Sequence, residues 1–133
     1  MRVLIADDDI DGAEVLKLMF EDAGCQVVVV HSGLEAIAQT PAFKPHLVVL
    51  DISMPGMDGI ETAARLSRDP ATSKDVVYVA HTSHRRSALL DRLKAAPFSH
   101  FVQKPSRFAS FEAILRSLAT GASDEGEGEG TPR

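Results

Sequence analysis

The sequence has one cysteine, no tryptophan, one tyrosine and no long apolar run. A single cysteine cannot close an internal disulfide, so Cys25 excludes a disulfide-stabilised fold. The apolar runs span only a few residues, whereas a helix needs roughly 20 to cross a bilayer. The first thirty residues also lack the pattern of a secretory leader. These absences predict a cytoplasmic protein that is not inserted in a membrane.

Positively charged residues are fewer than negatively charged ones. The formal net charge is −5 and the isoelectric point is about 5.4, which argues against a large basic surface for nucleic acid. Apolar residues make up 44% of the 133 residues and charged residues 25%, values typical of one folded globular domain. We therefore expect a protein or a small ion as the partner, and no nucleic acid.

Short β-branched segments alternate with longer stretches of helical period, as in repeated βα units. Several of these segments are almost continuously apolar, which is typical of central parallel strands covered by helices on both faces. The sequence therefore predicts a doubly wound α/β fold around a parallel sheet. The five predicted strands lie over 2–6, 26–30, 46–50, 76–80 and 99–103.

Capping residues mark where two helices should begin. Ser32 with Glu35, and Asp58 with Glu61, have the spacing of a reciprocal N-terminal capping pair. Gly24 stands where a left-handed residue would end a preceding helix. Apolar periodicity predicts the remaining helices over 11–23, 83–96 and 106–118.

Proline and leucine positions refine these helices. Pro41 and Pro45 are expected to end the helix that begins near Ser32. In the helix over 83–96, Leu89, Leu90 and Leu93 are expected to face inward. The last segment is rich in glycine and acidic residues and has no apolar residue after position 122, so it is expected to be a disordered tail.

Acidic and polar residues stand where the predicted strands end. Asp7 and Asp8 follow the first strand, Asp51 the third, Thr82 the fourth and Lys104 the fifth. Parallel sheets bind ligands outside the carboxyl ends of their strands. We therefore expect these side chains, far apart in sequence, to converge at one edge.

Three carboxylates facing one lysine leave two excess negative charges, which is unfavourable without a cation. Hard carboxylate oxygens with an open coordination sphere suit Mg²⁺, so we predict a divalent cation here. The Asp7–Asp8 pair would hold and orient it, and Asp51 would act as the nucleophile on a phosphoryl group. Lys104 would supply a positive charge to the phosphoryl oxygens, and Thr82 a hydroxyl donor.

These motifs resemble the receiver domain of two-component response regulators. The run from Asp51 to Gly59 looks like the family's phosphorylation segment, the run from Val3 to Asp9 like its acidic opening, and Lys104-Pro105 completes the set. The resemblance covers residues 1–119, and residues 120–133 would form the acidic, glycine-rich disordered tail. It is closest to the single-domain, chemotaxis-like type.

The resemblance implies a flavodoxin-like (βα)5 fold with strand order 2-1-3-4-5. It implies Mg²⁺, for which Mn²⁺ is expected to substitute, held by Asp8, Asp51 and the backbone carbonyl of Ser53, with Asp7 acting through a water. Thr82 and Phe101 would form a switch pair, and the Lys104-Pro105 peptide would be cis.

The resemblance also implies partners and an output. A histidine kinase or a histidine phosphotransfer protein would phosphorylate Asp51. The surface formed by the helix over 83–96, the strand over 99–103 and the following helix would then bind a downstream protein or another receiver. The chain would be a monomer or a phosphorylation-dependent dimer, and not an enzyme beyond its own phosphorylation and autodephosphorylation.

Some positions depart from the common family pattern. Ser83 follows the switch threonine, where alanine or glycine is more usual, and Phe101 lacks the hydroxyl of the tyrosine often found there. Ser53 and His84 occupy positions that influence how long the phosphoryl group survives, so its lifetime does not follow from the resemblance.

Simpler interpretations stand beside these. One of the three opening aspartates could merely cap the first helix, Lys104 could be an ordinary surface lysine, and Phe101 could be a plain core residue. His81 and His84 lack a third metal ligand. The chain could be a receiver fragment of a hybrid histidine kinase. An aspartate-based phosphatase with its nucleophile at Asp7 is the alternative from another class.

Overall fold

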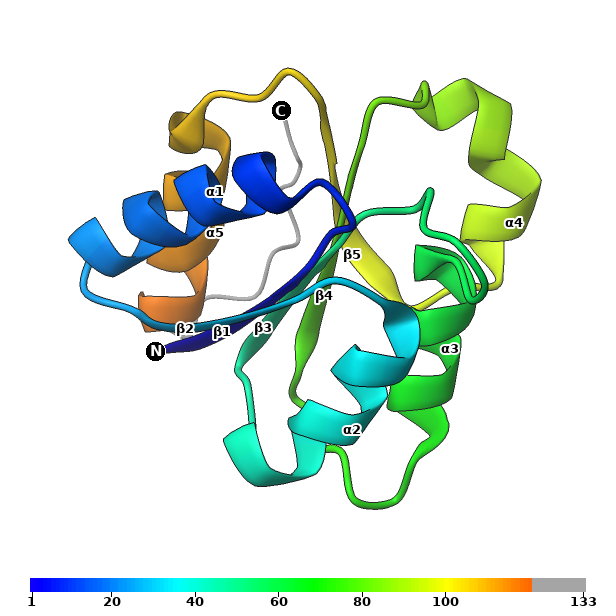
Figure 1. The fold of residues 1–133 in the computed structure, drawn as a ribbon, viewed down its shortest axis with the longest axis horizontal. Coiled ribbons are helices and arrows are strands. Elements are labelled where there is room, and N and C mark those ends of the chain that lie inside the picture. Colours follow the sequence, from blue (N-terminus) through cyan, green and yellow to red (C-terminus); the bar gives the residue numbers. More distant parts are fainter. Residues whose placement is uncertain (121–133) are drawn as a thin grey trace.

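The computed structural model describes residues 1–120, which form one five-stranded sheet with helices on both faces (Figure 1). Along the chain the elements are β1 (Arg2–Ala6), α1 (Ile10–Asp22), β2 (Gln26–Val30), α2 (Gly33–Phe43), β3 (Leu47–Leu50), α3 (Gly59–Arg68), β4 (Val77–Thr82), the 3₁₀ helix η1 (Arg86–Leu89), α4 (Leu90–Lys94), β5 (Phe98–Gln103) and α5 (Phe108–Thr120).

All strands are parallel, in the order β2-β1-β3-β4-β5. This confirms the predicted fold class and strand order. Every residue of β3, Leu47–Leu50, is buried, as are Val3 to Ala6 of β1. Such burial is expected of strands that have helices on both faces, and it places β1 and β3 at the centre of the domain.

The helices form two layers. α1 and α5 lie on one face of the sheet, and α2 and α3 cover the other (Figure 1). In the first layer, Phe20 of α1 is fully buried and packs edge-to-face on Phe108 and Phe111 of α5, with ring centroids 5.1 and 5.4 Å away. These aromatic contacts hold the first and last helices together on one face of the sheet.

The predicted capping residues begin both helices. The Ser32 hydroxyl accepts the Glu35 N–H at 3.1 Å, and the Asp58 carboxylate accepts the Glu61 N–H at 2.9 Å. The return contact in α2 differs from the simple reciprocal pair, because the Glu35 carboxylate accepts the N–H of His31, one residue before the cap, at 2.7 Å. Both caps therefore satisfy an otherwise unpaired donor at a helix start, and only Glu35 adds a return contact, because the Glu61 carboxylate pairs with Arg65.

One of the opening aspartates caps the first helix, as the simpler interpretation proposed. Asp9 caps α1, and its carboxylate accepts the Gly12 N–H at 3.3 Å. Gly24 follows the helix with φ of +93°, the left-handed conformation that glycine adopts without steric cost. Capping thus accounts for Asp9, and Asp7 and Asp8 remain for another role.

One predicted helix end is wrong. α2 continues through Pro41 and ends at Phe43, where Lys44 adopts a left-handed conformation just before Pro45. Because Pro41 lies in the last turn, its missing N–H removes one hydrogen bond without interrupting a long continuation. The helix therefore ends at Phe43, after the first proline and before the second.

The predicted helix over 83–96 is shorter and divided into η1 and α4. Leu89 and Leu93 pack against a core cluster that contains Ile52 and Ala80, as predicted. Leu90 is 44% exposed, so its predicted inward orientation is wrong. A 3₁₀ helix has three residues per turn instead of 3.6, and this change of period rotates Leu90 out of the inward face.

The last helix begins two residues later than predicted. The Ser106 hydroxyl forms a hydrogen bond with the His81 ring at 2.9 Å, and α5 begins at Phe108. Its buried face, with Phe111 and Ile114, agrees with the predicted periodicity. The predicted tail, apart from Thr120, lies outside the described residues. Within residues 1–120, no helix is both long enough and apolar enough to cross a membrane.

Candidate functional site

The sheet carries the predicted site residues to one edge. Asp7 and Asp8 follow β1, Asp51 follows β3, and Lys104 follows β5. Thr82 is the last residue of β4, which is two residues longer at this end than predicted. Ladder hydrogen bonds fix these positions: the Asp51 N–H donates to the Ala6 carbonyl at 2.9 Å, and the Lys104 N–H donates to the Thr82 carbonyl at 2.8 Å.

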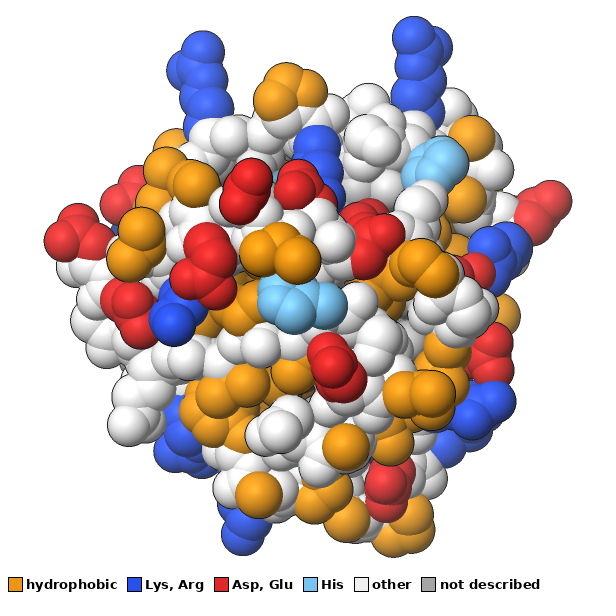
Figure 2. Space-filling view, viewed as in Figure 1, with side chains coloured by type: hydrophobic (Ala, Val, Ile, Leu, Met, Phe, Trp, Pro, Cys, Tyr) orange, Lys and Arg blue, Asp and Glu red, His pale blue; other side chains and the backbone are white. Residues whose placement is uncertain are grey.

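The three acids lie close enough to share an ion. One carboxylate oxygen from each of Asp7, Asp8 and Asp51 lies within 4.8 Å of the others. Asp7 and Asp51 are buried, whereas Asp8 is exposed. In the upper part of the face drawn in Figure 2, acidic side chains gather around a basic one. The cluster is therefore a half-open acidic pocket that solvent reaches from the side of Asp8.

Lys104 points into this cluster. Its ammonium lies 2.8 Å from the Asp7 carboxylate and 3.5 Å from the Asp51 carboxylate. Burial alone would lower the pKa of Lys104, but the hydrogen bond with Asp7 and the charges of Asp7 and Asp51 raise it above its ordinary value. The lysine is therefore charged at neutral pH, and it is not an ordinary surface lysine. The peptide that follows it, Lys104-Pro105, is cis, as the resemblance implied.

Asp51 has a pKa well above the ordinary value of an aspartate. Burial raises its pKa to about 6, and the neighbouring Asp7 charge adds to the rise, while Lys104 and the N–H of Ser53 act against it. The Ser53 N–H donates to the Asp51 carboxylate at 3.2 Å. Asp51 is thus mostly ionised at neutral pH but destabilised in that form, so it favours an added positive charge.

The donor set fits a hard divalent cation. Three carboxylates and one ammonium leave a net charge of −2, and only carboxylate oxygens converge, with no thiolate or imidazole among them. Mg²⁺ binds through one or two carboxylates and keeps several waters. The chemistry of these residues therefore matches Mg²⁺ better than a soft metal.

The loops after β3 and β4 contact each other through Ser53 and His84. The Ser53 hydroxyl and the His84 ring form a 2.5 Å hydrogen bond. The Thr82 hydroxyl is completely buried and accepts the His84 N–H at 3.2 Å. His84 therefore joins the two loops, a role that sequence reasoning did not assign because the partners are far apart along the chain.

Phe101 lies beside this loop, partly buried against the cluster of Ile52, Ile60 and Ala80. Leu89 of η1 and Leu93 of α4 pack against the same cluster. The contacts fit both predicted roles, a core residue and a member of a switch pair with Thr82, and the second stays a prediction.

Two further residues support the site without having been predicted. A Cβ on Gly59 would lie 2.1 Å from the Asp51 carbonyl oxygen, so only glycine allows α3 to begin so close to Asp51. Asp58, besides capping α3, forms an ion pair with Arg92 of α4 at 2.5 Å. No local sequence pattern reveals this pair, which ties α4 to the loop that carries Asp51.

The two histidines that lie three apart do not form a metal pair. The His81 ring is buried against Phe111, with ring centroids 5.2 Å apart, and bonds to Ser106. Burial lowers the pKa of His81 to about 4, and the charge of Lys104 contributes to the lowering. His81 is therefore a neutral core residue at physiological pH, while His84 contacts Ser53.

Comparison with known proteins agrees with this geometry. The family model described as the response regulator receiver domain matches residues 3–116. The chain belongs to the response regulator receiver domain family. It is a receiver domain of the kind found in two-component signal transduction, and its doubly wound five-stranded fold is shared with CheY-like receivers.

Particular relatives illustrate the match. The transcriptional regulatory protein TctD of Salmonella typhimurium is 34% identical over 120 residues, which are 89% of this chain and 51% of TctD. A CheY-like receiver domain from Methylobacillus flagellatus has a TM-score of 0.80 at 27% identity, covering 89% of this chain and 98% of that one. TrrA from Thermotoga maritima, solved in complex with Mg²⁺–BeF, has a TM-score of 0.76 at 26% identity, covering 88% and 97%.

Several curated relatives are longer than the receiver. The chain spans about half of TctD and about a third of a protein-glutamate methylesterase from Trichodesmium erythraeum. The shared part is the receiver itself, so the regulatory and methylesterase activities named for those proteins are not carried over to this chain.

Proposed function

We propose that this receiver accepts a phosphoryl group on Asp51 from a phosphohistidine of a histidine kinase or a histidine phosphotransfer protein. One observation carries the proposal: the Asp51 carboxylate lies both within the acidic cluster and 3.5 Å from the Lys104 ammonium. A nucleophilic oxygen, a place for a cation and a fixed positive charge thus meet at one strand edge.

In the transfer, a carboxylate oxygen of Asp51 forms a bond to phosphorus as the bond between phosphorus and the donor imidazole nitrogen breaks. The imidazole leaves and takes up a proton from solvent. Because the pKa of Asp51 is about 6, the carboxylate is in its reactive, ionised form at neutral pH. The Lys104 ammonium, now shared between Asp7 and Asp51, would move to a phosphoryl oxygen.

The acidic pocket would hold Mg²⁺, or Mn²⁺ in its place, through Asp8, Asp51 and the carbonyl of Ser53, with Asp7 acting through a water. When bound, the cation supplies positive charge that stabilises the phosphoryl oxygens. The protein residues orient the reaction: Gly59 lets α3 approach Asp51, and the Ser53 N–H holds one carboxylate oxygen.

Phosphorylation would be read out through Thr82. The Thr82 hydroxyl now accepts the His84 N–H, and its own hydrogen remains free to be donated to a phosphoryl oxygen. If Thr82 moved inward to make that bond, the linked His84 and the loop after β4 would shift with it, and the packing of Phe101 would change. The surface of α4, β5 and α5 would then change for a downstream protein or for another receiver, giving a monomer or a phosphorylation-dependent dimer.

Exposed apolar side chains on α1 favour a protein as the phosphoryl donor. Val15, Leu18 and Met19 are 52%, 62% and 43% exposed, and hydrophobic side chains are visible over α1 at the left of Figure 2. Because α1 begins directly after the acidic loop, a donor protein that presents its histidine to Asp51 would cover this surface. Leu18→Ser is expected to slow transfer from a phosphohistidine protein and to leave transfer from acetyl phosphate unchanged.

The chain would catalyse only its own phosphorylation and autodephosphorylation. It would act either alone or as the receiver part of a hybrid histidine kinase. Both arrangements place the same chemistry at Asp51.

The proposal is tested by incubation with acetyl phosphate and MgCl₂, followed by intact mass measurement. The wild type is expected to gain one phosphoryl group, and chelation of the metal is expected to abolish the gain. Asp51→Asn should gain none, whereas Asp22→Asn, a matched change at an exposed residue of α1, should behave as wild type. A wild type that gains no phosphoryl group would overturn the proposal.

A further inference from the structure

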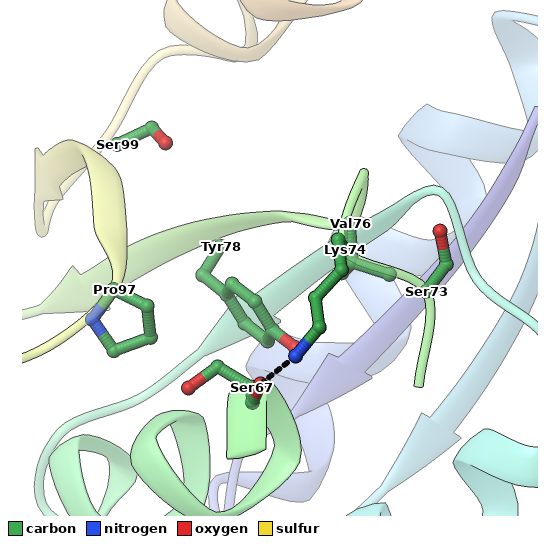
Figure 3. A pocket seen from close by; sticks show the side chains of 7 residues that line it. All are labelled: Ser67, Ser73, Lys74, Val76, Tyr78, Pro97 and Ser99. Atoms are coloured by element: carbon green, nitrogen blue, oxygen red, sulfur yellow. Dashed lines mark hydrogen bonds between the residues drawn. The ribbon is translucent and has the colours of Figure 1, made fainter. Parts of the chain in front are cut away.

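A pocket of about 280 Å³ opens at the opposite end of the sheet from Asp51 (Figure 3). It lies between the end of α3, the connection from α3 to β4, and the start of β5. Its volume is just below the range of ordinary small-molecule sites, so only a small ligand would fit. The residues that line it are Ser67, Ser73, Lys74, Val76, Tyr78, Pro97 and Ser99.

Tyr78 leaves an unmet hydrogen-bonding requirement in this pocket. Its side chain is 4% exposed, and its hydroxyl is buried without a hydrogen-bond partner among the described residues. In Figure 3 the ring points toward Ser67 and Lys74. Burial raises the pKa of Tyr78 to about 12, so at neutral pH the hydroxyl keeps its proton and is a donor. A buried donor of this kind calls for an acceptor oxygen.

Lys74 supplies a positive charge to this pocket. Its ammonium donates to the Ser67 carbonyl at 3.5 Å, the outer limit of a hydrogen bond, so this contact holds it weakly. It is the single formally charged side chain in the lining. Ser67 lies in the last turn of α3, where the helix presents partial negative charge. The partial negative charge of the helix offsets part of the ammonium charge, so the pocket favours a monoanion over a dianion.

The remaining walls define the rest of the ligand. Val76 and Pro97 offer apolar surface, while Ser73 and Ser99 offer hydroxyls at the rim. The site therefore combines a buried phenol donor, a weakly held ammonium and a short apolar wall. These features match a carboxylate group carried on a small apolar body.

We propose that this pocket binds a small monocarboxylate, whose oxygens accept from the Tyr78 hydroxyl and the Lys74 ammonium and whose apolar part packs on Val76 and Pro97. The site lies at the end of β4 remote from Thr82, and the proposal does not depend on phosphorylation of Asp51.

The experiment titrates sodium propionate into the ¹⁵N-labelled protein and follows its amide resonances, with sodium chloride at equal ionic strength as the reference. Saturable shifts are expected at residues 73–78 and at Phe98 and Ser99, which flank the proline of the pocket wall. Tyr78→Phe keeps the ring and removes only the hydroxyl, so it should fold and should bind propionate at least tenfold more weakly. Lys74→Met should do the same, while Lys94→Met, a matched change on α4, should bind as wild type.

A second measurement uses stability. Without propionate, Tyr78→Phe is expected to unfold at higher denaturant concentration than wild type, because it removes the unpartnered hydroxyl. With propionate, the wild type should gain more than the variant. The proposal is overturned if no saturable shift occurs at these residues, if Tyr78→Phe binds as wild type, or if inorganic phosphate produces the same shifts as propionate.

Discussion

Replacing Asp51 with Asn is expected to stabilise the metal-free protein. Asp51 is only 6% exposed, and its pKa rises from 3.8 to about 6, first because of burial and then because of the charge of Asp7. A rise of about 2 units, at about 1.4 kcal/mol per unit, corresponds to about 3 kcal/mol of destabilisation of the folded state when the group is ionised. Asn keeps the shape of the side chain and an oxygen for the Ser53 N–H, and it removes the charge.

The sign of the pH dependence follows from the raised pKa. Below about pH 4 the carboxyl of Asp51 is protonated in both the folded and the unfolded chain, so the charge costs nothing. Between about pH 4 and 6 the unfolded chain releases its proton while the folded chain retains it, so the stability of the wild type falls as pH rises. Above about pH 6 the full penalty remains, and Asp51→Asn should exceed the wild type by up to about 3 kcal/mol.

Urea denaturation in the presence of a chelator, measured from pH 4.5 to 7.5, tests this prediction. The free energies of unfolding of wild type and Asp51→Asn should converge at the acidic end and separate toward pH 7.5. Asp8→Asn is the matched control, because it removes the same charge from an exposed residue and should give a smaller gain. Equal stability of wild type and Asp51→Asn at pH 7.5 would refute the claim that buried charge destabilises this site.

Four other substitutions test the packing around the site and in the core. Gly59→Ala would bring a Cβ to 2.1 Å from the Asp51 carbonyl oxygen. It should therefore cost roughly 1–3 kcal/mol of stability and weaken Mg²⁺ binding measured by calorimetry. A variant with unchanged stability and binding would contradict the close approach. Phe20→Ala should lose about 3–5 kcal/mol in urea denaturation because Phe20 is fully buried, and a loss below 1 kcal/mol would argue against its central place in the core. Arg92→Ala should cost less than about 1 kcal/mol, as expected for a partly exposed ion pair. Asp58→Ala should cost about 1 kcal/mol more because it also removes the cap of α3, and equal losses for these two variants would show that the cap contributes nothing.

The parts of the fold that follow from local chemistry were predictable. β1 and β2 have the predicted bounds because they are short runs of apolar residues between turn residues. The starts of α2 and α3 follow from Ser32 and Asp58, whose side chains bond within the first turn. These predictions succeeded because each depends on residues that are close together in the sequence.

The region after β4 was not predictable in detail, because contacts between distant segments set its structure. The Thr82 hydroxyl accepts the His84 N–H, and the His84 ring reaches Ser53 in another loop. Because of these bonds, the chain after position 83 does not adopt the helical conformation that its apolar spacing predicts. The division between η1 and α4, and the exposure of Leu90, follow from that late start.

The convergence of the site residues was predictable, but the pairing among them was not. Strand ends alone predicted that Asp7, Asp8, Asp51 and Lys104 converge, because parallel strands share one carboxyl edge. The spacing of these residues does not tell which carboxylate Lys104 contacts, and in the structure its ammonium lies 2.8 Å from Asp7 and 3.5 Å from Asp51. Such a choice between two carboxylates depends on side-chain geometry that no spacing encodes.

The most direct test of the central claim locates the phosphoryl group itself. The protein is phosphorylated with acetyl phosphate and MgCl₂, the acyl phosphate is trapped by borohydride reduction, and the modified peptide is sequenced by mass spectrometry. The account predicts modification at Asp51 alone, in the segment that leads into α3. Modification at Asp7, the nucleophile of the phosphatase alternative, would contradict it.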